Sequence, residues 1–103
     1  MRKAVQSFPE NLNVAIVATG GLSHQIHGER CGFTNEGWDQ EFLSLLAQDQ
    51  EALTEVRLAE YAEKGGMEGA EVIMWLIMRG ALSHQVNNVY QTTYLPSMTN
   101  IAT

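Results

Sequence analysis

The first feature of the hydrophobic pattern is a short apolar run, residues 13–19, that is rich in β-branched side chains. Asparagine precedes the run, and Gly20-Gly21 follow it. A continuous apolar run of this length between turn residues is typical of a strand that is buried on both faces of a sheet. The pattern therefore predicts a buried strand whose carboxyl end delivers the two glycines to the edge of a sheet where ligands tend to bind.

The pattern changes to helical spacing after a glycine-rich loop at residues 28–37. Apolar residues from Trp38 to Leu46 recur on one face, and Thr34 or Asn35 precedes them as a candidate N-cap. Both side chains are oxygen acceptors of the kind that helix N-termini favour. We therefore expect an amphipathic helix that begins near Trp38.

Further helical segments are expected in the middle of the chain. Residues 49–56 indicate a turn or a short helix, and the next helical stretch is stopped by Gly65-Gly66. The strongest helix prediction covers residues 67–79, because residues 72–78 are apolar without interruption. A helix that is apolar all round is expected to be buried on every side.

The C-terminal part of the sequence favours strands. Residues 85–94 are rich in Val, Tyr and Thr and are closed by Leu95-Pro96, which predicts a strand, and Ile101 begins a further element. Together the segments predict an α/β fold, a partial mixed sheet with packed helices. The predicted strands are too few to cover the apolar helix, which indicates a piece of a larger domain.

Composition narrows the class of protein and of partner. The chain has 103 residues, 45% of them hydrophobic, which fits one domain and excludes a disordered chain. Six basic and twelve acidic residues give a net charge of -6, which argues against nucleic acid as a partner. The single cysteine, Cys31, cannot form an internal disulfide, so we expect a cytoplasmic protein. The sequence shows neither a bilayer-spanning run nor a signal peptide, so no membrane partner is expected.

Two histidines follow the predicted strand. His24 is a candidate general acid or base, because a histidine side chain titrates near neutral pH. The alternative is an ordinary loop histidine that is bonded to the backbone. The spacing of His24 and His27 would suit a metal pair on a helix, but Gly28 disfavours a helix there, and we expect His27 to face solvent.

A carboxylate stands directly before the apolar run of the strongest helix. Glu71 needs a cation, hydrogen-bond donors or a metal if it enters an apolar region. One interpretation is an oxygen ligand for a divalent ion, and the other is an acid that favours the helix N-terminus and points to solvent. Glu68 competes for either role, and the pattern alone leaves the interpretations even. For Cys31 and His84 we expect no role in the chemistry.

Several blocks of the sequence resemble the class III extradiol ring-cleavage dioxygenases, the family of protocatechuate 4,5-dioxygenase (its β subunit) and gallate dioxygenase. They match in order over nearly the whole chain, at residues 18–25 (ATGGLSHQ), 38–40 (WDQ) and 68–82 (EGAEVIMWLIMRGAL). Within the family, the chain is most similar to gallate dioxygenases at residues 24–30 (HQIHGER), 64–66 (KGG) and 95–99 (LPSMT).

The resemblance implies a non-haem Fe(II) enzyme that uses O2 to open an aromatic ring beside two adjacent hydroxyls. The implied substrate is gallate, which would give 4-oxalomesaconate, or a related protocatechuate-type acid. The family's glutamate ligand corresponds to Glu71, and its second-sphere catalytic histidine corresponds to His24. The Ser97-Met98-Thr99 loop matches a segment that lines the substrate site in relatives, so we expect Thr99, and also Ser23, to bind the substrate.

The chain departs from the family in its metal ligands. The two histidine ligands of the family lie in an N-terminal region with no counterpart here, and neither His27 nor His84 matches them. The resemblance therefore implies that residues 1–103 are the C-terminal part of a catalytic domain, which alone should bind iron weakly or not at all.

The expected partners are a small aromatic substrate, O2, and either a second copy in a homodimer or the rest of the catalytic domain. The alternative function is a non-catalytic fragment or interaction subunit of the same fold, which is inactive without the missing region.

Overall fold

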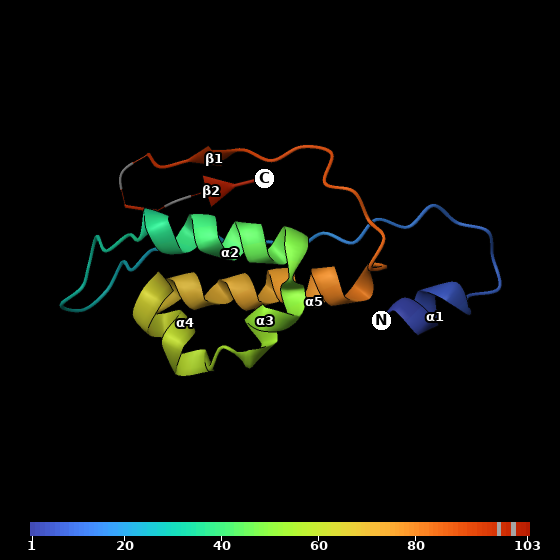
Figure 1. Cartoon of the computed structure of the whole chain (residues 1–103), viewed down its shortest axis with the longest axis horizontal. Coiled ribbons are helices and arrows are strands. Elements are labelled where there is room, and N and C mark those ends of the chain that lie inside the picture. The colour runs from blue at the N-terminus through green and yellow to red at the C-terminus, as the bar shows by residue number, and fades with distance from the viewer. Residues whose placement is uncertain (97, 100) are drawn as a thin grey trace.

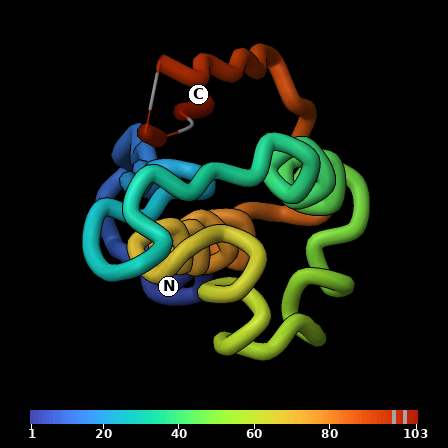
Figure 2. The backbone as a smooth tube through the Cα atoms, turned by 90° about the vertical axis from the view of Figure 1, so that its left-hand side faces the viewer, coloured from blue at the N-terminus to red at the C-terminus, as the bar shows by residue number. Residues whose placement is uncertain are grey.

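The protein is described here by a computed structural model for residues 1–96, 98–99 and 101–103. In chain order, the elements are α1 (Arg2–Gln6), α2 (Glu36–Gln48), α3 (Gln50–Glu55), α4 (Leu58–Gly65), the 3-10 helix η1 (Glu68–Val72), α5 (Ile73–Ala81), β1 (Thr93–Tyr94) and β2 (Ile101–Ala102). Helices α2 and α5 lie side by side, with the two strands beyond α2 and with α3 and α4 on the other side (Figures 1 and 2). Helix α1 lies at one end of the molecule (Figure 1).

Helices α2, α3 and α4 form where the sequence predicts them. Asn35 caps α2, because its side-chain oxygen accepts a hydrogen bond from the backbone nitrogen of Trp38 at 3.1 Å. Helix α4 ends at Gly65, and Gly66 follows with a φ of 85°. Glycine adopts such a positive φ readily, whereas other residues rarely do.

The core lies where α2, α3, α4 and α5 meet. Its centre is a group of aromatic rings: the Phe42 ring lies 6.4 Å from the rings of both Tyr61 and Trp75, and Trp38 lies 5.8 Å from Tyr61, between ring centroids. Edge-on pairs at these distances are favourable beyond the area that they bury. The Tyr61 hydroxyl donates a hydrogen bond to the Leu53 carbonyl at 2.6 Å, which ties α4 to α3.

The prediction of a single buried helix over residues 67–79 is wrong in two respects. The segment divides into η1 and α5, and the helical structure continues to Ala81. Helix α5 is also not covered on every side, since Met74 and Ile77 are 50% and 47% exposed. The described elements pack against one side of α5, so its other apolar side faces solvent.

The prediction of a buried strand over residues 13–19 is also wrong for this chain. The segment has no regular secondary structure and is mostly exposed, with Val17 at 79%. No backbone hydrogen bond among the described residues involves it. A strand needs a neighbour to satisfy its backbone groups, and no described segment supplies one.

The strands predicted in the C-terminal part of the chain form only in part. Of residues 85–94, only Thr93–Tyr94 form a strand, and it pairs antiparallel with Ile101–Ala102, the further element that was expected to begin at Ile101. The α/β prediction is therefore confirmed in its coarse form, helices beside a small sheet. The described sheet has two antiparallel strands and is not mixed. No helix within the described part of the chain has the length and apolar character needed to span a bilayer.

Candidate functional site

The loop after residue 19 and the helix η1 bring His24 and Glu71 together. The His24 Nε2 atom lies 3.6 Å from Glu71 Oε1, and the same oxygen accepts a hydrogen bond from the Gly21 nitrogen at 2.6 Å. Gly20 has a φ of 138°, and a Cβ there would lie 3.0 Å from Glu71 Cγ. The two glycines therefore let the backbone approach the Glu71 carboxylate closely.

The backbone of His24 is held on both sides, by the last residue of α4 and by the first turn of η1. Its nitrogen donates to the Gly65 carbonyl at 2.8 Å, and its carbonyl accepts from the Gly69 nitrogen at 3.1 Å. A Cβ at Gly66 would overlap the His24 carbonyl oxygen, so this close approach requires glycine. The position of His24 thus depends on the glycines that end α4 and begin η1.

The orientation of the His24 ring follows from its hydrogen bond to the backbone. Its Nδ1 atom lies 2.7 Å from the Leu22 carbonyl oxygen. Because a carbonyl oxygen only accepts, Nδ1 carries the hydrogen, and Nε2 of the neutral ring keeps its lone pair. The side chain is 13% exposed, with Nε2 toward Glu71. In this tautomer of the neutral ring, Nε2 is the nitrogen with acceptor capacity.

Thr99 lies beside His24. The two residues form an isolated antiparallel bridge, and a Cβ at Gly21 would lie 3.2 Å from both Thr99 Oγ1 and His24 Cε1. The predicted substrate-binding residue is thus next to the predicted acid or base, although its role stays a prediction. Ser97, which precedes it in the predicted loop, lies outside the described residues.

Ser23 has contacts of a different kind. It is 1% exposed, its nitrogen donates to Asp39 Oδ1 at 2.8 Å, and its hydroxyl donates to Asp39 Oδ2 at 2.5 Å. The hydroxyl also accepts a hydrogen bond from the Asn35 nitrogen at 2.7 Å. The substrate-binding role of Ser23 stays a prediction, but these contacts favour a structural role.

Asp39 is the residue of this region that the sequence pattern did not single out. Counted from Asp39, the buried residues Phe42, Leu43 and Leu46 follow at the third, fourth and seventh positions. Asp39 thus heads the apolar stripe of α2 and is 1% exposed. An acidic residue inside such a stripe is the signal that would have identified it, because a buried carboxylate needs specific donors.

Glu68 and Glu71, which the pattern could not distinguish, have different partners. Glu71 lies beside His24, whereas Glu68 Oε1 lies 2.9 Å from His27 Nδ1. The hydrogen bond with His27 holds the pKa of Glu68 below its ordinary value. The His27 side chain is largely exposed, as the sequence predicts.

The described residues do not by themselves fit a complete iron site. Among them, no group of three or more His, Cys, Asp or Glu side chains is arranged to hold a metal. His27 is engaged by Glu68, and His84 lies 3.0 Å from the Gln50 amide nitrogen. For an iron site of two histidines and one carboxylate, the described residues therefore offer one candidate ligand, the partly exposed carboxylate of Glu71.

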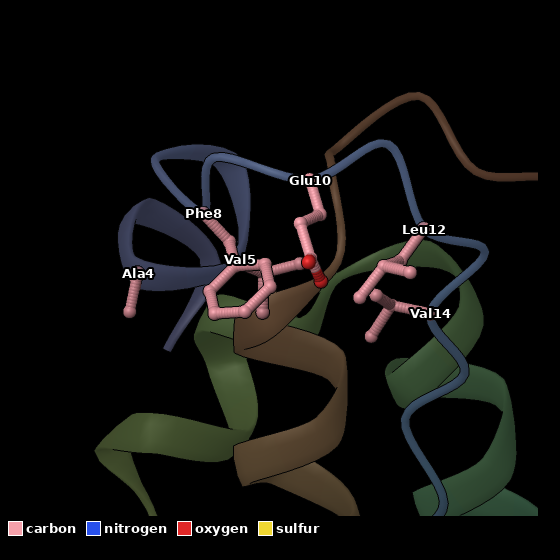
Figure 3. Close-up of a pocket in the computed structure, with 6 residues that line it drawn as sticks. All are labelled: Ala4, Val5, Phe8, Glu10, Leu12 and Val14. Carbon is pink, nitrogen blue, oxygen red and sulfur yellow. The ribbon is translucent and has the colours of Figure 1, made fainter.

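A cavity of about 620 Å³ lies away from this region, at the N-terminal end of the chain (Figure 3). It is lined mostly by apolar side chains of α1 and the segment after it: Ala4, Val5, Phe8, Glu10, Leu12 and Val14. Neither His24 nor Glu71 contributes to it, so it is not part of the candidate site.

Two comparisons with known proteins bear on the site. Residues 1–103 match the family described as the catalytic LigB subunit of aromatic ring-opening dioxygenase. The chain is also 66% identical, over all 103 residues, to a protein of Pseudomonas putida named gallate dioxygenase. The match covers 100% of this chain and 30% of that relative.

Proposed function

Because the chain belongs to the family of the catalytic LigB subunit of aromatic ring-opening dioxygenases, we propose that it forms part of an extradiol active site that opens the ring of gallate with O2. The observation that carries the proposal is the approach of His24 Nε2 to Glu71 Oε1, 3.6 Å apart. The similarity to a protein named gallate dioxygenase supports gallate as the substrate, with a protocatechuate-type acid as the related choice.

In this proposal Glu71 is one ligand of an Fe(II) ion. The support is its carboxylate, which is partly exposed and is fixed by the Gly21 nitrogen at 2.6 Å. Carboxylates and imidazoles are the donors that non-haem iron sites use. The two remaining ligands would come from polypeptide outside this chain, so residues 1–103 act as the C-terminal part of a catalytic domain.

His24 is the proposed general base and acid. Its Nε2 lone pair would take the proton of a substrate hydroxyl, and the resulting imidazolium would lie 3.6 Å from the Glu71 carboxylate. The Leu22 carbonyl would keep the Nδ1 hydrogen in place during this transfer. The Thr99 hydroxyl, beside His24, would hydrogen-bond the substrate.

The proposed partner is the rest of a catalytic domain. Residues 13–19 would pair with a strand outside this chain, since their backbone has no hydrogen bond among the described residues and Val17 is exposed. A homodimer that uses the same segment is the second arrangement.

The free, exposed thiol of Cys31 supports a cytoplasmic location.

The same exposed segment favours a second candidate function, a non-catalytic interaction subunit. It would bind a partner chain through residues 13–19 without contributing to ring opening. The two functions differ in whether His24 and Glu71 affect turnover.

The experiment uses an exchange protein, in which this chain replaces the matching segment of the Pseudomonas putida relative. We expect Glu71→Ala to remove bound iron together with gallate-dependent O2 uptake. We expect His24→Ala to retain iron and to lower kcat by roughly 10²- to 10⁴-fold, the usual contribution of a general acid or base.

The neighbouring pair offers matched controls, because Glu68→Ala and His27→Ala remove the same side-chain types from the same two segments. Both controls should keep iron and activity. Full iron occupancy in Glu71→Ala would disprove the ligand assignment. Unchanged turnover in both Glu71→Ala and His24→Ala would favour the non-catalytic function.

A further inference from the structure

We propose that Asp39 is a positioning residue, which orients the His24 imidazole through the peptide group between Leu22 and Ser23. The inference rests on the proposed role of His24 as base. The supporting observation is a pair of hydrogen bonds in series. Asp39 Oδ1 accepts from the Ser23 nitrogen at 2.8 Å, and the Leu22 carbonyl oxygen accepts from His24 Nδ1 at 2.7 Å.

These two bonds use opposite ends of one rigid group. The Leu22 carbonyl and the Ser23 nitrogen belong to the same peptide, which is planar and trans, so its N–H and C=O point in opposite directions. An acceptor that fixes the N–H therefore also fixes the direction of the C=O. A carboxylate on the N–H side further polarises the peptide and makes its oxygen a stronger acceptor for the imidazole.

The surroundings of Asp39 keep this chain of bonds in place. Its second oxygen accepts from the Ser23 hydroxyl, which in turn accepts from the nitrogen of Asn35, the N-cap of α2. Asp39 lies near the N-terminus of α2, where the helix dipole favours a negative charge. Both Asp39 and Ser23 are 1% exposed, so water does not compete for these bonds.

Gly69 closes the other side of the peptide. A Cβ there would lie 3.0 Å from the His24 nitrogen and 3.1 Å from the Leu22 oxygen. The peptide is thus held between the carboxylate of Asp39 and the backbone of η1. The result is a defined tautomer of His24, with hydrogen on Nδ1 and a free Nε2 toward Glu71.

The test measures the tautomer and the kinetics separately. The 103-residue chain contains three histidines, so the ring ¹⁵N shifts of His24 can be assigned by NMR. The wild-type chain should show the Nδ1–H tautomer alone in the neutral ring. Asp39→Asn, which has the same shape but no charge, should show a measurable fraction of the Nε2–H tautomer.

Kinetics of the exchange protein provide the second readout. Asp39→Asn should lower kcat by roughly 10- to 100-fold, the effect of a displaced catalytic group, with KM for gallate and iron content within about threefold. Ser23→Ala keeps the Ser23 nitrogen as a donor and should have a smaller effect in the same direction. Tyr61→Phe, which removes a buried hydrogen bond between α4 and α3 that involves neither Asp39 nor Ser23, is the control and should change neither kcat nor tautomer.

The outcomes separate this inference from the function on which it rests. An unchanged His24 tautomer in both Asp39→Asn and Ser23→Ala would overturn the positioning role. So would an unchanged kcat in both variants when His24→Ala is inactive. If His24→Ala itself kept full activity, the proposed function would fail, whereas the tautomer measurement would still test the action of Asp39 on the ring.

Discussion

At the scale of single residues, close packing of backbone against backbone determines where His24 lies. Gly69 is the clearest case, since the three atoms that a Cβ at this position would approach most closely belong to the backbone of Leu22, Ser23 and His24. Backbone atoms cannot rotate away as the end of a flexible side chain can. A methyl group at Gly69 must therefore displace either η1 or the residues that carry the site.

The first prediction follows from this packing. Gly69→Ala should destabilise the chain by about 1–3 kcal/mol, as overpacking in a filled interior does. The control is Gly80→Ala, since Gly80 lies in α5 with no atom within 4 Å of a Cβ, and it should stabilise by about 0.5–1 kcal/mol through helix propensity. Urea unfolding measures both changes, and equal stability of the two variants would contradict the account.

The pair of His27 and Glu68 gives a prediction about pH. The hydrogen bond with His27 lowers the pKa of Glu68 in the folded chain below its ordinary value of 4.5. A lowered folded pKa contributes stability that is present above the ordinary value and is lost as the pH falls. The difference in unfolding free energy between wild type and Glu68→Gln should therefore be larger near pH 6 than near about pH 3. A constant difference over this range would show that the bond does not form in solution.

The site residues differ in how far the sequence could reveal them. The residue pattern makes His24 a candidate acid or base and leaves Glu71 and Glu68 even, and the resemblance then favours Glu71, because several blocks match a family at once. Asp39 stands in a matching block, yet its role depends on contact with Ser23 across the fold. Such a contact is set by how α2 packs against the loop, which local spacing does not encode.

At the scale of elements, local signals predict the helices and fail for the strands. The cap at Asn35 and the two glycines at the end of α4, Gly65 and Gly66, act within a few residues of the helix ends, so the sequence shows them directly. The predicted helix 67–79 is divided into η1 and α5, and Gly69 of η1 packs against the backbone of His24, a long-range contact that local spacing does not show. Residues 13–19 have a strand pattern but no neighbour among the described residues.

The hydrogen bond between Tyr61 of α4 and Leu53 of α3 predicts how stability changes at high pH. Burial raises the pKa of the Tyr61 phenol above 10.0, and its hydroxyl donates to the Leu53 carbonyl. A raised folded pKa means that stability falls as the pH rises above the ordinary value, because the unfolded chain loses the proton first. Wild type should therefore lose more unfolding free energy than Tyr61→Phe between about pH 9 and pH 11. Parallel losses in denaturant titrations of the two proteins would contradict this.

At the scale of the whole molecule, the chain is more extended than a compact domain of its length. Its radius of gyration is 15.0 Å, compared with about 13 Å for a compact chain of about 100 residues. Its extents are 50 × 26 × 23 Å, and α1 with the segment after it accounts for one end of the long axis (Figure 1). The chain spans 30% of the length of its relative, and residues 13–19 have no backbone hydrogen-bond partner among the described residues.

The exposed segment leads to a prediction that contrasts two contexts. In the 103-residue chain Val17 is 79% exposed, so Val17→Asp should change the unfolding free energy by less than about 0.5 kcal/mol. In the exchange protein the proposed pairing would bury Val17, and the same change should cost several kcal/mol or prevent folding, since an unpaired charge would enter the interior. Equal small effects in both proteins, measured by urea unfolding, would show that the segment stays exposed.

Whether this chain contributes to ring opening is best tested by gallate-dependent oxygen uptake, measured side by side for the 103-residue chain and the exchange protein after anaerobic addition of Fe(II). We expect uptake with loss of the aromatic absorbance for the exchange protein and none for the chain alone, because the chain would supply one of the three proposed iron ligands, Glu71, together with the proposed base His24. Uptake by the chain alone at a comparable rate would contradict the claim that its site is incomplete. An inactive exchange protein, beside an active parent relative, would contradict the claim that the chain contributes to ring opening.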